Sequence, residues 1–136
     1  MFLNLLSKEE KQNFINLAII AANINGSFET EEKELIKGYQ REMDISMESI
    51  VLDSNDNEES VFHFFAASEK SHKKIVLFEI IGLLTCDSSF DEKEKDFVFR
   101  LSKAIGLSAD DVDTLSQFAL RYSDIVIDIA DSIFAP

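Results

Sequence analysis

Several residue types are scarce in this chain, and each scarcity excludes a class of protein. Cys86 is the only cysteine, so the chain has no internal disulfide and suits a reducing compartment. The only proline is Pro136, so no proline interrupts an earlier helix. The apolar runs at 14–22 and 75–84 are shorter than the roughly 20 residues of a membrane span, and the apolar start at 1–6 is too short for a signal peptide. We therefore expect a soluble, cytoplasmic protein without direct membrane insertion.

Positive charge is scarce as well. The sequence has 26 acidic residues against 13 basic ones, which gives a formal net charge of -13. Such a surface repels phosphate backbones and anionic membranes, and this argues against nucleic acid as a partner. The acidic surface favours cations or basic protein partners, although acidity also serves solubility alone.

Apolar residues at spacings of three and four are abundant, while strict alternation is almost absent. This pattern predicts an all-α fold, a compact bundle of about seven helices in one domain that spans residues 1–136. A capping box of Ser7 and Glu10 marks the start of a helix that is apolar on nearly all sides through Ala22. Further helices are expected at about Thr30–Met43, briefly after Ser46, around Val61–Phe65, from His72 to Cys86, and after Asp91.

A repeat becomes visible when the chain is shifted by 62 positions. The shift superposes identical residues, namely Ile19 on Ile81, Ser27-Phe28 on Ser89-Phe90, Glu32-Lys33 on Glu94-Lys95, and Ser46 on Ser108. Identical turn residues are harder to obtain by accident than matching apolar positions. We therefore predict a duplicated unit of helix, acidic turn and helix, with repeat 1 at about 14–50 and repeat 2 at about 76–112, packed about a pseudo-twofold axis.

The last predicted helix covers about residues 109–134 and starts with a capping box of Ser108 and Asp111. Its apolar stripe consists of Val112, Leu115, Ala119, Tyr122, Val126, Ile129 and Ile133. Such a stripe either closes the bundle or docks a protein partner, and the sequence leaves both interpretations open. The aspartates off the stripe are expected to face water, and they are Asp124, Asp128 and Asp131.

The two acidic turns are the candidate binding site. Carboxylates in a turn and in the following first helical turn can converge on a hard cation, which takes several oxygen ligands. The predicted metal ligands are Asp87, Asp91, Glu94, Glu32 and Asn25, with Ca²⁺, Mg²⁺ or Zn²⁺ as the ion. A full calcium loop of the EF-hand type is excluded, because its first ligand position would be Ala21 or Leu83.

The same acids also have a purely structural interpretation. Asp91 as N-cap with Glu94 three residues later is a capping box, which stabilises a helix start without any ion. This interpretation leaves Asp87 and the repeated phenylalanines unexplained. The sequence contains no Gly-rich phosphate loop, zinc-binding helix or nucleophile elbow. We therefore predict a non-catalytic protein without an organic cofactor.

The paired turns resemble those of the TerB-like family, whose domains are helical duplications linked to tellurite resistance. That family has Asp-Gly, a small apolar or aromatic residue and then a glutamate at a helix start, and the resemblance runs from Phe14 to about Leu115. It implies a TerB-like fold, a stress-response role, and metal binding through Asn25, Glu32, Asp87 and Glu94. Asn25 replaces the first acid and Ser88 the second glycine, so metal binding is less well supported at the first turn. The alternative function is a metal-free protein interaction or structural domain.

Overall fold

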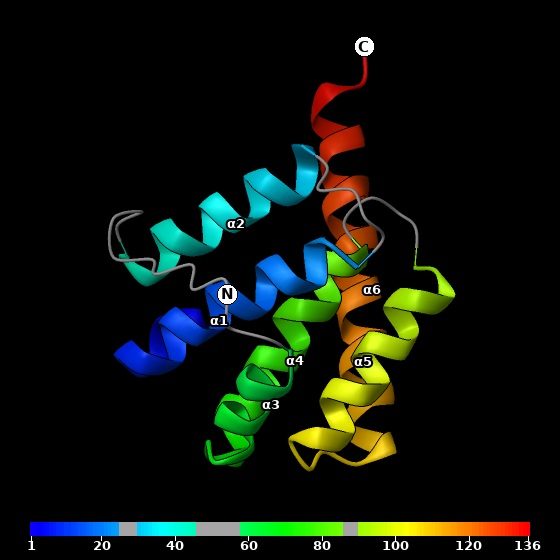
Figure 1. Ribbon diagram of the computed structural model, residues 1–136. Coiled ribbons are helices and arrows are strands. Elements are labelled where there is room, and N and C mark those ends of the chain that lie inside the picture. The colour runs from blue at the N-terminus through cyan, green and yellow to red at the C-terminus, as the bar shows by residue number, and fades with distance from the viewer. Residues whose placement is uncertain (25–29, 46–57, 86–89) are drawn as a thin grey trace.

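The computed structural model describes residues 1–24, 30–45, 58–85 and 90–136 (Figure 1). In these residues every regular element is a helix, so the predicted all-α class is confirmed. The elements are the 3-10 turn η1 (Leu3–Leu5) and the α-helices α1 (Lys8–Ala22), α2 (Thr30–Met43), α3 (Glu58–Ala66), α4 (Lys70–Thr85), α5 (Glu92–Ala104) and α6 (Ala109–Phe134). The short helix predicted after Ser46 lies outside the described residues, so the number of about seven helices stays a prediction.

The predicted capping boxes at the starts of α1 and α6 are both present. In α1 the Ser7 hydroxyl accepts from the Glu10 backbone N–H at 3.2 Å, and the Ser7 N–H donates to Glu10 Oε1 at 2.8 Å. In α6 the corresponding distances between Ser108 and Asp111 are 3.1 and 3.4 Å. Each box satisfies backbone N–H groups that have no partner inside the helix, and so fixes where the helix begins.

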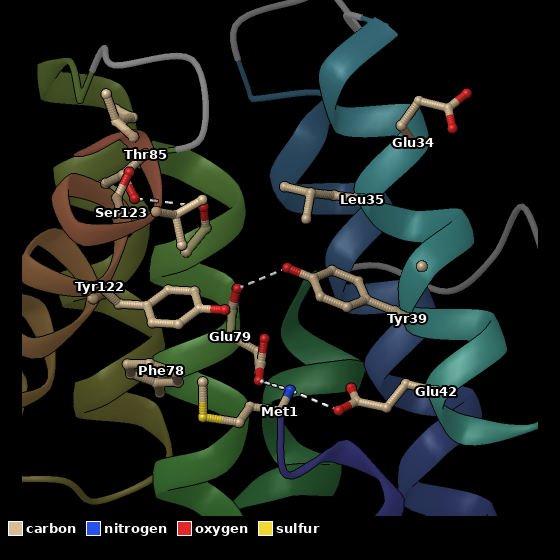
Figure 2. A pocket seen from close by; sticks show the side chains of 15 residues that line it. Met1, Glu34, Leu35, Tyr39, Glu42, Phe78, Glu79, Thr85, Tyr122 and Ser123 are labelled. Carbon is tan, nitrogen blue, oxygen red and sulfur yellow. Dashed lines mark hydrogen bonds and ion pairs between the residues drawn. The ribbon is translucent and has the colours of Figure 1, made fainter. Parts of the chain in front are cut away.

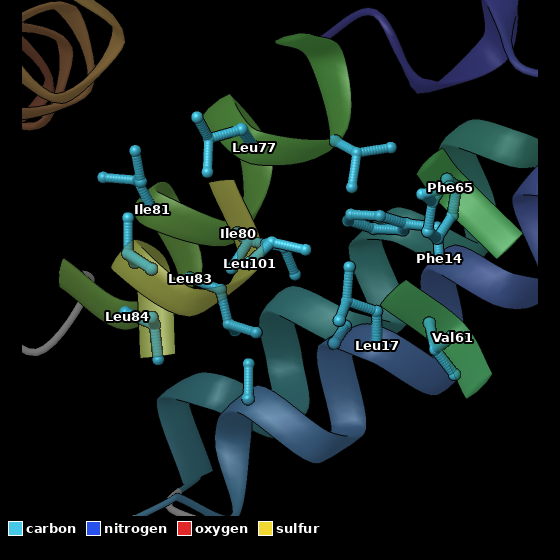
Figure 3. Packing of buried hydrophobic residues seen from close by; sticks show 14 of the residues in the cluster. Phe14, Leu17, Val61, Phe65, Leu77, Ile80, Ile81, Leu83, Leu84 and Leu101 are labelled. Carbon is cyan, nitrogen blue, oxygen red and sulfur yellow. The ribbon is translucent and has the colours of Figure 1, made fainter. Parts of the chain in front are cut away.

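The helices α1 and α4 form the centre of the bundle. The first packs against α2, α3 and α4, and the second also contacts α5 and α6. Figure 3 shows their side chains meeting around Phe14, Leu17 and Ile80, with Phe65 from α3 and Leu101 from α5 beside them. All of these side chains are fully buried, and burial of one such side chain stabilises the fold by about 1.5–3 kcal/mol. The all-round apolar character of α1 and α4 thus reflects burial on all sides.

The helix pairs α1–α2 and α4–α5 have the same spacing along the chain. Both helices of the second pair start 62 residues after those of the first, from Lys8 to Lys70 and from Thr30 to Glu92. The helices α2 and α5 also end in the same turn: the Ile45 N–H donates to the Gln40 carbonyl at 3.0 Å, and the Leu107 N–H to the Ser102 carbonyl at 2.9 Å. This is the Schellman pattern, and it requires a positive φ at the residue before the donor. That residue is Asp44 with φ 55° in one helix and Gly106 with φ 83° in the other.

The last helix, α6, occupies the predicted range and is the longest, with 26 residues. Only Ala119 of this helix is buried, and Figure 1 shows the C-terminal turns of α6 projecting beyond the other helices. Among the described helices, α6 included, none has the length and apolar character that crossing a bilayer requires. The first part of α6 therefore closes the bundle over α4, and the rest extends away from it.

Candidate functional site

The second acidic turn is formed in part by described residues, and these form a capping box. Asp91 is the N-cap of α5, its Oδ1 accepts from the Glu94 N–H at 2.9 Å, and the Asp91 N–H donates to Glu94 Oε1 at 3.1 Å. Glu94 is buried in this arrangement, with an exposed fraction of 3%. The capping interpretation of these two acids is confirmed.

The metal interpretation is not tested by the described part of the chain. Asn25, Asp87 and the side chain of Glu32 lie outside the described residues. Within the remainder, no group of three or more His, Cys, Asp or Glu side chains is arranged to hold an ion. Of the predicted ligands, Asp91 and Glu94 are the two whose side chains are described, and they lie together at the start of α5. The ion site stays a prediction.

The described residues form a groove between α2 and α6, with α4 as its floor. Its volume is about 790 Å³, within the range of about 300–1,000 Å³ that is usual for ligand sites. Figure 2 shows Tyr39 of α2 and Tyr122 of α6 facing each other across the groove, with Phe78 of α4 below them. The remaining apolar lining includes Leu35, Ala119, Val126 and Ile127. The groove is therefore an apolar channel between two helices.

Several polar groups in the groove are paired with one another. The Tyr39 hydroxyl donates to the Glu79 carbonyl at 3.1 Å. The α-ammonium of Met1 lies 2.7 Å from Glu42 Oε1 and 2.7 Å from Glu79 Oε1. Burial lowers the pKa of this ammonium, but its hydrogen bonds to the two carboxylates outweigh that effect and raise the pKa above the ordinary value of 8.0. The positive charge at Met1 thus compensates the buried carboxylate of Glu79.

Sequence reasoning did not predict this groove, although one signal for it was present. Glu79 interrupts the apolar run at 75–84, and a charge in an otherwise apolar helix requires a partner once it is buried. The Met1 ammonium, which pairs with its carboxylate, and Tyr39, which donates to its backbone carbonyl, are far from it in the sequence, at separations of 78 and 40 residues. The signal therefore pointed to Glu79 but not to the residues around it.

The apolar stripe of α6 is divided between core and solvent. Val112 and Leu115 pack against the core and Ala119 is buried. Beyond this point the stripe is exposed, to 51% at Tyr122, 52% at Ile129 and 66% at Ile133. The first part of the stripe therefore closes the bundle, and docking of a partner on the exposed part stays a prediction. The predicted exposure of Asp124, Asp128 and Asp131 is confirmed.

A second polar arrangement joins the starts of α1 and α4. His72 Nδ1 lies 2.8 Å from Glu10 Oε1, and His72 Nε2 lies 2.8 Å from Glu69 Oε1. Both ring nitrogens of His72 thus lie within hydrogen-bond distance of a carboxylate oxygen. Burial raises the pKa of Glu10, but hydrogen bonds from the Ser7 backbone, Ser68, His72 and the Ser7 hydroxyl outweigh it and lower the pKa below 4.5. Glu10 and His72 are 62 residues apart, the separation of the predicted repeat.

No protein-family model matches the chain, and neither a curated protein nor a solved structure shows significant similarity to it. The resemblance to the TerB-like family therefore rests on the sequence motifs alone and stays a prediction. Any statement of function must come from the groove, the exposed helix and the acidic turns themselves.

Proposed function

We propose that this protein is a non-catalytic interaction module that binds a helical segment of another protein in the groove between α2 and α6. The observation that carries the proposal is the exposed apolar face of α6 beyond Ala119, which lies beside an apolar groove. Contiguous exposed apolar surface of this kind marks interaction sites in soluble proteins. An amphipathic helix with apolar residues on one face is the segment that fits a channel between two helices.

The non-catalytic part of the proposal is supported by the pairing of polar groups in the groove. Its buried acid, Glu79, is held by the Met1 ammonium, and Tyr39 donates to a backbone carbonyl. An active site needs titratable groups that converge on a substrate position. In this groove the polar groups instead hold the floor and walls together.

The experiment is a binding titration with a fluorescent synthetic helix that has a leucine face and glutamine at its polar positions. Val126 lines the groove and Leu120 does not, yet both are on α6 and both are 46% exposed. We expect Val126→Asp to weaken binding at least about tenfold, a loss of about 1.4 kcal/mol, and Leu120→Asp to leave it unchanged. Fluorescence anisotropy measures the Kd.

The two variants also control for folding. Since both positions are exposed, each substitution should change the free energy of unfolding by less than about 0.5 kcal/mol. The proposal fails if the wild-type protein does not bind the helix, or if the two variants bind it equally well.

We further propose that the two halves of the chain arose by duplication of a TerB-like unit. The proposal is supported by the shared spacing of 62 residues and by the identical turns after α2 and α5. A crystal structure should allow α1 and α2 to be superposed on α4 and α5, with Asp44 falling on Gly106. A different crossing angle in the two pairs would contradict it.

Metal binding at the second acidic turn is a separate proposal, supported by the two carboxylates that the α5 capping box holds at one helix start. Calcium, magnesium or zinc should then raise the thermal midpoint of chelator-treated protein, because the ion binds only the folded state. Asp87→Asn combined with Glu94→Gln should abolish the rise. The absence of a shift with all three ions would rule the proposal out.

A further inference from the structure

We propose that the groove selects a cationic amphipathic helix, whose apolar face lies between α2 and α6 and whose lysine or arginine residues lie at its flanks. This inference rests on the proposed function, since it names the chemistry of the segment that the groove binds. It is carried by the charges around the groove.

The charged side chains among the described residues that line the groove are all acidic. They are Glu34, Glu42 and Glu79, and these described lining residues include no lysine, arginine or histidine. The Met1 ammonium is the positive group there, and it lies between Glu42 and Glu79. One ammonium offsets one of these two carboxylates, so the groove keeps negative charge. A bound segment with positive flanks would complement it.

The acids lie at both ends of the groove, with apolar residues between them. Figure 2 shows Glu34 at one end and Glu42 with Met1 at the other, while Leu35 and Tyr39 lie between. Glu34 and Glu42 are two turns apart on α2, which corresponds to about 12 Å. A helix that lies along α2 could contact both Glu34 and Glu42 if its own cations are spaced about two turns apart.

The existing partner of Glu34 does not prevent this contact. Lys37 Nζ lies 3.5 Å from Glu34 Oε1, and both side chains are more than half exposed, 59% and 63%. Exposed pairs of this kind are weak because water and salt screen them. A cation from a bound segment can therefore share or replace Lys37.

The projecting part of α6 extends the negative charge. It carries the exposed residues Asp124, Asp128 and Asp131, and Arg121 is the only basic residue of the whole helix. Arg121 itself lies over the Phe118 ring, 5.5 Å from its centroid. These aspartates lie on the side of α6 opposite its apolar stripe, so they add to the negative potential around the groove without lining it.

These charges also disfavour a second copy of this chain as the occupant. Each chain has a formal net charge of -13, so two copies repel each other as they approach. Like charges that face one another across an interface suppress association. A basic segment of another protein removes this repulsion.

The experiment compares three fluorescent synthetic helices with the same leucine face and with lysine, glutamine or glutamate at their polar positions. At low ionic strength we expect the lysine helix to bind about tenfold more tightly than the glutamine helix, and the glutamate helix to bind more weakly than either. Added salt should reduce the difference, mostly through a slower association rate in stopped-flow measurements.

A matched pair of variants locates the effect. Glu34→Gln removes an exposed carboxylate that lines the groove, and Glu92→Gln removes an exposed one at the start of α5, and each is paired with a lysine three residues later. We expect the first variant to reduce the preference for lysine severalfold and the second to leave it unchanged. Circular dichroism checks that both variants remain helical.

The outcomes separate this inference from the proposed function. Equal binding of all three helices would overturn the charge preference and leave the proposed function intact, whereas no binding of any helix would overturn both. An equal effect of the two variants would overturn the placement of the cations along α2. A dimer in sedimentation experiments that Ile129→Asp dissociates, or binding to lipid vesicles that Val126→Asp abolishes, would overturn the choice of partner.

Discussion

Among the described helices, the first three and the last three begin alike and end differently. The pairs α1–α2 and α4–α5 share their spacing and the turn that ends the second helix. The helices that follow them diverge. The 9-residue helix α3 buries Val61, Phe62 and Phe65, whereas the 26-residue helix α6 buries Ala119 alone. The common part of the two halves builds the centre of the core, and of the two helices that differ, α3 adds to the core whereas α6 provides exposed surface.

The difference in the third helix follows from length. With a rise of 1.5 Å per residue, the 16 residues of α4 span about 24 Å and the 26 residues of α6 about 39 Å. The end of α6 therefore passes the end of the helix on which it packs. Its apolar residues there lose their neighbours, although the sequence pattern continues without a break.

The strongest test of this comparison truncates one apolar side chain in each third helix. Phe65→Ala should destabilise the protein by about 3–5 kcal/mol, because the side chain is fully buried and its loss leaves a cavity. Ile129→Ala should change stability by less than about 0.5 kcal/mol, because the residue is exposed. Urea unfolding measures both values. A large loss for Ile129→Ala would mean that the end of α6 is packed in solution.

The next test concerns the turns that end α2 and α5. Gly106→Ala should destabilise the protein by about 1–2 kcal/mol, because an L side chain is strained at φ 83°. The Cβ atom of the new alanine would lie 4.0 Å from Lys73 Nζ, its nearest neighbour, so a steric clash adds little to this loss of stability. Asp44→Gly should raise stability, because glycine adopts φ 55° without strain. The gain should stay below about 1 kcal/mol, because aspartate tolerates this region and glycine adds entropy to the unfolded chain. Thermal unfolding measures both variants. A loss of stability in both would contradict the shared turn.

A smaller effect is expected at the α5 capping box. Asp91→Ala should destabilise the protein by about 1 kcal/mol through loss of the N-cap, and Asp91→Asn should retain most of that stability. Ser7→Ala is the matched change at the start of α1. Chemical denaturation compares the three. Equal losses for Asp91→Ala and Asp91→Asn would show that the charge of Asp91, rather than its capping oxygen, matters.

The smallest effect is expected from pH at Glu10. Its pKa is lower in the folded protein than its ordinary value of 4.5, so ionised Glu10 stabilises the fold above pH 4.5. That contribution is lost as the pH falls through the lower pKa of the folded state. The stability difference between wild type and Glu10→Gln should therefore be largest above pH 4.5 and should shrink in acid. A difference that does not vary with pH would contradict the lowered pKa.

The features predicted correctly from the sequence depend on residues that are close together along the chain. Ser7 with Glu10, Asp91 with Glu94, and Ser108 with Asp111 are each three residues apart, so their capping boxes follow from the local sequence. The pairing of Glu10 with His72 was missed, although both positions are related by the spacing of the repeat. Symmetry related the two residues, but only the crossing of α1 and α4 brought them within hydrogen-bond distance.

By itself, the sequence determined the helical class, the starts of α1, α5 and α6, and the apolar character of the central helices. These properties depend on helical periodicity and on contacts within one turn. Only the tertiary structure decided that Met1, Tyr39, Glu79 and Tyr122 share one groove, and where the stripe of α6 leaves the core. The physical reason is that the same apolar spacing serves a buried and an exposed face equally well. Which one results depends on whether a neighbouring helix is long enough to cover it.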